Sequence, residues 1–482
     1  MDYKINWAQH SVINKIEIKK TMKKILTLII LIAISISIFP QTQVSGNQSG
    51  TWTAVNSPYL VTGEILIPEG QTLTIEAGIE VNFQGHYKFT VNGNLQALGT
   101  ETDSIFFTTD NQATGWGGIR FDGSDGISNL SYCRIEYGKT AGSYPDIHGG
   151  GMALLTSDAV VSNCVFADNE ATGEDNGMGG AVYAISTGSP SETLTRFTDC
   201  KFIRNHTYGE GGAIKFTYDM NTEITGCEFI ENTCNYGGGA ISLYSVVDTK
   251  MIYCLFADNY TMYSNGGAVH TLGMGNSLIF ENCTMSGNSA VTGDGGAVYL
   301  VFASASFVNC IIYENTGAYS DDIYLEMGGW ADINYCNLTM PDGATGSNNI
   351  NENPQFVDAA NLDFQLMETS PCIDAGIDIG YEYYGVAPDM GCYEYDPLTG
   401  TNNYQSNSLV FFPNPTSGEI NLEFAYNNIR QIKIIDLTGK TIIEKSRIQQ
   451  NETIDLSPFE AGIYIINIQT DKEITTQKII KK

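Results

Sequence analysis

Two short phrases alternate through residues 133–340, and their period constrains the fold more than any other feature. One is Cys-x-Phe-x-x-Asn, whose cysteine recurs every 26 to 36 residues, and the other is Gly-Gly-Ala followed by Val or Ile. A repeat of this length indicates a solenoid in which each repeat forms one coil. The cysteines that mark the repeat are Cys133, Cys164, Cys200, Cys227, Cys254, Cys283, Cys310 and Cys336.

The repeat unit is predicted to be β-structure. Apolar and polar residues alternate around each cysteine, and Gly and Asn interrupt every segment, which is typical of short strands and turns. The cysteine and the residue two positions later share one face of a strand, and residues such as Phe202 and Phe229 place that face in the core. Coils about 4.8 Å apart stack their cysteines too far apart for disulfides, so the row is expected to be buried free thiols.

Two further rows follow from this register. The Asn five residues after each cysteine lies at a turn, where Asn tolerates left-handed backbone and can form an amide ladder. After each Gly-Gly-Ala-Val/Ile phrase comes a residue expected to point outward, either as a ligand-facing row or as ordinary solvated surface. The members of this outward row are Tyr183, Lys215, Ser242, His270 and Tyr299.

The alternating phrases resemble the repeats of chlamydial polymorphic outer-membrane proteins and, more broadly, bacterial right-handed parallel β-helix proteins. This resemblance implies an all-β protein in which residues 47–350 form a right-handed parallel β-helix solenoid. It does not imply an activity, because that fold carries lyases, hydrolases, adhesins and passive stalks.

The N-terminal region is predicted to contain an export signal. Residues 1–21 are interpreted as a misassigned gene start, and a cytoplasmic head with a short anchor is the alternative. Residues 22–46 read as a signal peptide, because two lysines precede about 15 apolar residues, fewer than the about 20 of a membrane span. We expect cleavage between Pro40 and Asn47, and no transmembrane span in the mature chain.

Residues 351–396 contain the phrases NPQFVD, SPCIDAG and DMGCYEY. They resemble a closing segment of secreted bacterial β-helix proteins, and are predicted to cap the last coil. Cys372 and Cys392 lie together in this segment and are the best candidate disulfide pair. Residues 397–407 have the Gly, Asn, Ser and Thr content of a linker.

Residues 408–482 contain FFPNPTSGEINLEF, IKIIDLTGK and IDLSPFEAGIYIINI. These motifs resemble the type A sorting domain of the type IX secretion system of Bacteroidetes. Alternating Ile and Val with Gly turns predict about seven strands in a small C-terminal β-sandwich. The resemblance implies that the type IX secretion machinery is a partner, and that the protein is secreted or attached to the outer face of the outer membrane.

The charge argues against some partners. Residues 47–407 contain 43 acidic and 9 basic residues, which argues against nucleic acid and anionic membranes. Five of these nine cations lie close together in the sequence. They are Arg196, Lys201, Arg204, Lys215 and Lys250.

Three functions remain open: a glycan-binding or adhesin-like surface protein, a polysaccharide lyase or glycoside hydrolase, and a passive structural protein. Resemblance to β-helix lyases implies a cationic base on the outer face with Ca²⁺ held by acids, which makes Lys215 a weak catalytic candidate. The acid pairs that would bind Ca²⁺ or serve a glycosidase are Asp321 with Asp322 and Asp122 with Asp125. No cofactor is certain, and a polysaccharide or surface glycan is the expected partner.

Overall fold

The computed structural model describes most of the chain from residue 41 to residue 481. The residues it leaves out in that range are 125, 173–176, 187–194, 219–220, 247, 274, 397–400, 404–409, 413–415, 417, 424–429, 437–439, 447–451, 461 and 470–473. The predictions for residues 1–40, which include most of the signal peptide, lie outside the described residues. No described helix is long and apolar enough to cross a membrane; the described helical segments are two 3₁₀ turns, η1 (Ala54–Asn56) and η2 (Ala359–Asn361).

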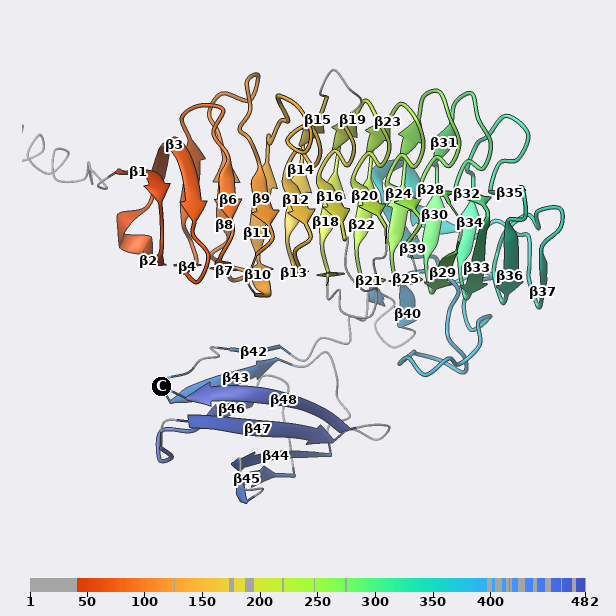
Figure 1. Ribbon diagram of the computed structural model, residues 1–482. Helices are drawn as coiled ribbons and strands as arrows, with labels where there is room; N and C mark the ends of the chain where they lie inside the picture. Colours follow the sequence, from red (N-terminus) through yellow and green to blue (C-terminus); the bar gives the residue numbers. More distant parts are fainter. Residues whose placement is uncertain are drawn as a thin grey trace, which may run out of the picture.

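The main body is the predicted parallel β-helix, with strands stacked side by side along one axis (Figure 1). The strands at the repeat cysteines, together with four strands before the first cysteine, form one parallel stack. It consists of β1 (Thr42–Asn47), β3 (Tyr59–Ile67), β5 (Glu80–Phe83), β8 (Ile105–Thr108), β11 (Cys133–Glu136), β14 (Val165–Ala167), β18 (Lys201–Ile203), β22 (Glu228–Ile230), β26 (Leu255–Ala257), β30 (Thr284–Ser286) and β34 (Ile311–Tyr313).

The strands that follow the Gly-Gly-Ala phrases, with β6 and β9 before them, form a second stack, which joins the first through the long strand β3. It consists of β6 (Phe89–Val91), β9 (Ile119–Asp122), β12 (Met152–Leu155), β16 (Val182–Ile185), β20 (Ile214–Thr217), β24 (Ile241–Tyr244), β28 (Val269–Leu272), β32 (Val298–Val301) and β35 (Ile323–Glu326).

A third parallel sheet closes each coil, and a short fourth sheet lies between the first two stacks in the chain order of each coil. The third consists of β2 (Gly50–Trp52), β4 (Thr72–Ile75), β7 (Asn94–Leu98), β10 (Ser128–Ser131), β13 (Ala159–Ser162), β17 (Arg196–Thr198), β21 (Asn221–Thr225), β25 (Asp248–Ile252), β29 (Asn276–Glu281), β33 (Ala303–Val308), β36 (Trp330–Asn334) and β37 (Thr345–Ser347). The fourth consists of β15 (Glu170–Ala171), β19 (His206–Thr207), β23 (Thr233–Cys234), β27 (Tyr260–Thr261) and β31 (Ser289–Ala290).

Each Gly-Gly-Ala phrase makes a turn that requires glycine. Gly238 has a φ of +68°, and a Cβ added there would lie 2.1 Å from the carbonyl oxygen of Ile241. A Cβ on the following Gly239 would lie 2.1 Å from the carbonyl oxygen of Gly267 in the next coil. Both positions exclude any side chain, so the phrase is explained by the geometry of stacked turns.

The core has the predicted interior rows. Phe166, Phe202, Phe229 and Phe256 are fully buried and stack with ring centroids 5.0, 4.8 and 4.8 Å apart. The cysteines of the repeat are buried free thiols, as the spacing predicted. Aromatic rings stacked at the coil repeat therefore fix the register of the solenoid.

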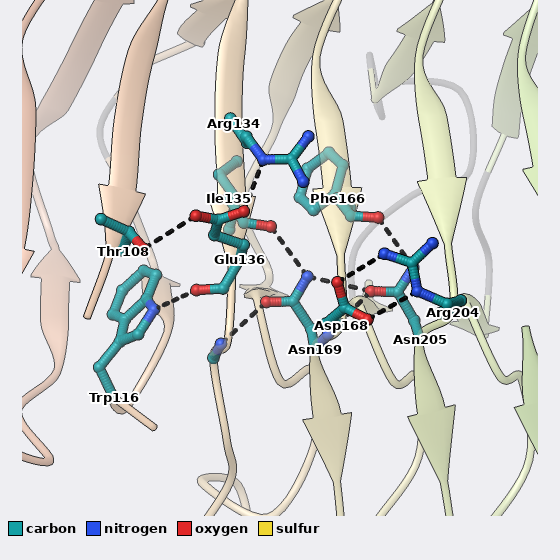
Figure 2. A network of polar contacts seen from close by, with 11 residues as sticks. Thr108, Trp116, Arg134, Ile135, Glu136, Phe166, Asp168, Asn169, Arg204 and Asn205 are labelled. Atoms are coloured by element: carbon teal, nitrogen blue, oxygen red, sulfur yellow. Dashed lines mark hydrogen bonds and ion pairs between the residues drawn. The ribbon is translucent and has the colours of Figure 1, made fainter. Parts of the chain in front are cut away.

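The predicted amide ladder is present (Figure 2). Asn169 donates its side-chain NH₂ to Ile135 O and to Asn205 Oδ1, at 2.9 and 3.0 Å, and Asn205 repeats the pattern with Phe166 O. The left-handed residue of each turn is the one before the Asn, such as Arg204 with a φ of +51°. The Asn row is thus explained by buried hydrogen bonds between coils, while the backbone strain lies one position earlier.

Residues 351–396, predicted to cap the last coil, contact that coil and also extend away from it; we call them the lateral flap. Their start pairs with the end of the solenoid, where Asn337 donates to Glu352 O, and Asn337 also donates to Cys372 Sγ. The remainder, with β38 (Phe356–Asp358) and β39 (Asp363–Leu366), packs back along the outer face of the first stack, where Phe364 contacts the apolar cluster around Leu255. Outward positions in these coils are buried because the lateral flap covers them.

The predicted disulfide is not formed. Cys372 and Cys392 are both free, buried thiols. Cys372 packs with Ile311 in one apolar cluster, whereas Cys392 packs with Leu255 in another. The two cysteines are close in sequence but serve different contacts between the lateral flap and the sheet.

The domain limits differ slightly from the prediction. The first coil begins with β1 at Thr42 and not at residue 47, and part of the predicted linker is a strand, because β41 (Thr401–Asn403) pairs with β40 (Glu394–Asp396). The predicted C-terminal β-sandwich is confirmed. One of its sheets consists of β42 (Val410–Phe412), β43 (Glu419–Glu423) and β46 (Glu452–Asp455). The other sheet consists of β44 (Gln431–Asp436), β45 (Thr441–Lys445), β47 (Gly462–Gln469) and β48 (Ile474–Lys481).

Candidate functional site

The outward row predicted from the sequence does lie along one line of the second stack. Tyr183, Lys215, Ser242, His270 and Tyr299 are successive register partners. The expectation that they lie on open surface is wrong, because each is at most 6% exposed. We therefore call them the buried row.

Loops between the fourth sheet and the second stack cover the buried row. A Cβ on Gly237 would lie 3.0 Å from the His270 ring, so this loop packs directly on the imidazole. An earlier loop places the His148 ring 4.5 Å from that of Tyr183, centroid to centroid. The sequence pattern gave the strand face correctly but carried no sign that the loops fold over it.

Lys215 forms a buried ion pair. Its Nζ lies 2.5 Å from Glu210 Oε2 and 3.0 Å from Ser242 Oγ, and its side chain is 4% exposed. Burial lowers the pKa of the Lys215 ammonium, and the Glu210 carboxylate only partly opposes this shift. The ammonium lacks an exposed position from which it could reach a polymeric substrate, which weakens Lys215 as a catalytic base.

Two histidines in this region are held neutral. Burial lowers the pKa of His270 to about 4, with a contribution from Lys215, and burial likewise lowers that of His148 to about 4. His148 Nδ1 accepts a hydrogen bond from the Met178 amide, whereas His270 Nδ1 is buried and has no hydrogen-bond partner among the described residues. Charging either ring would place a cation under the covering loops.

The other basic residues mostly pair with acids. Lys201 Nζ lies 2.9 Å from Glu228 Oε2 in the next coil, and Lys250 Nζ lies 2.8 Å from Glu281 Oε2. Arg196 is exposed, with Glu223 as its register partner. The Lys201 and Lys250 ion pairs connect adjacent coils, as expected for opposite charges on neighbouring strands.

Arg204 is the best example of such a pair (Figure 2). Its guanidinium makes two hydrogen bonds of 2.9 Å to the carboxylate of Asp168 in the preceding coil. Half of the Arg204 side chain remains exposed, so this pair contributes at most about 1 kcal/mol. The basic coils are therefore not assembled into one cationic site.

The candidate acid pairs are also separated by their environments. Asp322 is buried and ends the amide ladder by accepting a hydrogen bond of 3.1 Å from Asn315, and burial raises its pKa to about 6. Asp321 and Asp122 are exposed, and Asp125 lies outside the described residues. Within the described part of the chain, no group of three His, Cys, Asp or Glu side chains is arranged to hold a metal ion.

A different set of side chains is exposed on the covering loops, and we call it the exposed ridge. Each of five consecutive coils contributes one large apolar side chain shortly after the fourth-sheet position. These residues and their exposed fractions are Tyr208 46%, Tyr236 46%, Tyr263 62%, Val291 54% and Tyr319 89%. Exposed apolar residues that recur in the same loop of successive coils form a candidate interaction surface.

Backbone hydrogen bonds between coils hold the exposed ridge in place. Tyr236 N donates to Gly209 O at 3.0 Å, and Tyr263 N donates to Asn235 O at 2.9 Å. The rings of Tyr236 and Tyr263 lie 6.4 Å apart, centroid to centroid, with their planes at 46°. The ridge is therefore built on ordered loops. The sequence carried a sign of it, because a large apolar residue lies one or two positions after the small residue at Thr207 and its equivalents.

Two family models match parts of this chain. Residues 410–482 match the family of secretion system C-terminal sorting domains, and residues 282–300 match the Chlamydia polymorphic membrane protein repeat. A crystal structure of pectate lyase Pel9A superposes with a TM-score of 0.34 and 14% sequence identity, over 68% of this chain and 88% of that chain. No curated protein matches this chain.

The repeat match falls within the β-helix, and the sorting-domain match covers the C-terminal β-sandwich. Proteins with such a tail are handled by the type IX secretion machinery. The chain is a parallel β-helix protein with a type IX secretion sorting tail, and it is therefore secreted or displayed at the cell surface.

Proposed function

We propose that this protein is a non-catalytic glycan-binding protein that acts outside the cell and binds through the exposed ridge. The observation that carries the proposal is the recurrence of one exposed apolar side chain in each of five consecutive coils. Tyrosine suits this role, because its ring offers an apolar face that stacks on a sugar and its hydroxyl offers a hydrogen bond.

The chemistry around Lys215 supports binding over catalysis. The ammonium is engaged by Glu210 and Ser242 beneath the covering loops. Catalysis requires a base within hydrogen-bonding reach of the substrate proton. By contrast, the exposed ridge needs no rearrangement to meet a ligand, because its loops are already hydrogen-bonded in place.

The test is binding of the full chain to immobilised polysaccharides, compared with the variant Tyr236→Ala/Tyr263→Ala. Tyr218→Ala is a matched control, because Tyr218 is 46% exposed, as Tyr236 is, but lies at the other end of strand β20. We expect the double variant to lose binding, and the control to keep it, at unchanged melting temperature.

Three results would decide against the proposal. Equal binding by the double variant would remove the exposed ridge as the site. Release of products from a polysaccharide would favour the lyase or hydrolase function. Failure to bind any polysaccharide would favour a passive structural role.

A further inference from the structure

The spacing of the exposed ridge sets the direction of its ligand. Register pairs and backbone hydrogen bonds place successive ridge residues in successive coils, which are about 4.8 Å apart along the axis. A ligand that touches several of them must be extended and must run along the solenoid axis. A pyranose unit in an extended β-1,4-linked chain advances by nearly the same length as one coil.

The loops that carry the ridge also supply polar groups suited to sugar hydroxyls. Asn235, Ser264 and Thr292 lie on the same loops and are at least partly exposed. Amide and hydroxyl side chains both donate and accept, which matches the hydroxyl groups of a sugar. The surface thus combines stacking rings with hydrogen-bonding groups along one line.

The charge of these loops selects against anionic glycans. The five loop segments, residues 208–210, 235–237, 262–265, 291–294 and 317–322, contain no lysine or arginine. They do contain acids without a lysine or arginine partner in these loops, Asp294 and Asp321, whereas Glu210 is neutralised by Lys215. A uronate or sulfate on the ligand would be repelled without a counter-charge.

We infer that the ligand of the exposed ridge is an uncharged, extended polysaccharide bound parallel to the solenoid axis, with roughly one sugar unit per coil. This inference rests on the proposed function and adds the ligand class and its direction.

The loops that carry the exposed ridge are held by contacts beneath them as well as by hydrogen bonds to neighbouring coils. Glu210 bonds to Lys215 and Ser242, and Gly237 packs on His270. Because these loops are already fixed, ligand binding loses little conformational entropy of the protein, which favours affinity.

The test is calorimetric titration of the full chain with neutral β-1,4-linked oligosaccharides, from the disaccharide to the hexasaccharide. Uronate oligosaccharides of the same lengths form the comparison series. We expect affinity for the neutral series to rise with each added unit up to about the pentasaccharide, since five coils contribute to the ridge. Tyr236→Ala/Tyr263→Ala should lower the affinity for the longest neutral ligand at least about tenfold.

The failures are distinguishable. Affinity that does not grow with length would overturn the axial direction, and uronates that bind as tightly as neutral chains would overturn the ligand class. In both cases, loss of binding in the double variant would leave the proposed function intact. If the full chain binds neither series of oligosaccharides and no immobilised polysaccharide, the inference fails together with the proposed function.

Discussion

The buried pair of Lys215 and Glu210 gives the sharpest prediction, because it links the buried row to the loop that carries Tyr208. Lys215→Met keeps a side chain of similar length and removes the ammonium, leaving the Glu210 carboxylate without its cation. Removing one partner of a buried pair costs about 3–5 kcal/mol. Glu210 keeps 20% of its side chain exposed, so water can solvate part of the charge and the lower end, about 3 kcal/mol, is expected.

The assay is urea unfolding together with hydrogen exchange of the segment around Glu210, because coils of a solenoid need not unfold together. Lys201→Met is the matched control. The Lys201 side chain is 50% exposed in its pair with Glu228, so loss of this pair should cost at most about 1 kcal/mol. The variant Lys215→Met/Glu210→Met removes both charges and should recover most of the loss.

This reasoning would be refuted if Lys215→Met were as stable as Lys201→Met, or if removing both charges cost as much as the two single changes together. Lys215→Met also separates the two active functions. A binding protein should keep some affinity for glycan with a loosened loop. A lyase that used Lys215 would instead lose product formation while binding persisted.

Four further predictions concern two buried titratable groups, the core register and the sorting domain. The pKa of histidine is about 6.5 in the unfolded chain and about 4 for folded His270. The folded state is therefore destabilised as the pH falls from 6.5 to 4. His270→Phe should reduce this loss of stability, measured by unfolding at acid pH. Burial, together with Asp389, raises the pKa of the Glu394 carboxyl to about 8. The stabilising contribution of this group is therefore present below about pH 4.5 and is lost as the pH rises towards 8. Glu394→Gln should make the free energy of unfolding less dependent on pH over that range, and an unchanged dependence would contradict the assignment. Phe229→Asp should prevent folding, because it puts an unpaired charge between two stacked rings, and a soluble, cooperatively melting variant would refute the core register. Deletion of residues 408–482 should leave a folded β-helix in the periplasm, and its display at the surface would contradict the sorting role.

The sequence predicted those features that depend on the coil repeat alone. Phe202 and Asn205 recur with the cysteines, and their neighbours in adjacent coils are the same residue types, so stacking and the amide ladder follow from the period. The face of Lys215 was also correct, because strand alternation determines it.

Burial of that face could not be predicted in the same way. Whether Lys215 is exposed depends on the path of a loop, and the packing of Gly237 on His270 leaves no periodic pattern. The path of the lateral flap along the first stack could not be predicted for a similar reason. The residues around Leu255 look like outer surface within one repeat, and only contacts across more than a hundred residues, such as that of Cys392 N with Thr284 Oγ1, show what covers them.

The most direct measurement is tyrosine nitration of the full chain, with and without a saturating neutral hexasaccharide, followed by mass-spectrometric mapping of modified residues. In the free protein the exposed tyrosines should react and the buried Tyr183 and Tyr299 should not. With ligand, we predict protection of Tyr208, Tyr236 and Tyr263, and unchanged modification of the control residue Tyr218. Equal modification of the ridge tyrosines with and without bound ligand would contradict the assignment of the exposed ridge as the glycan-binding site.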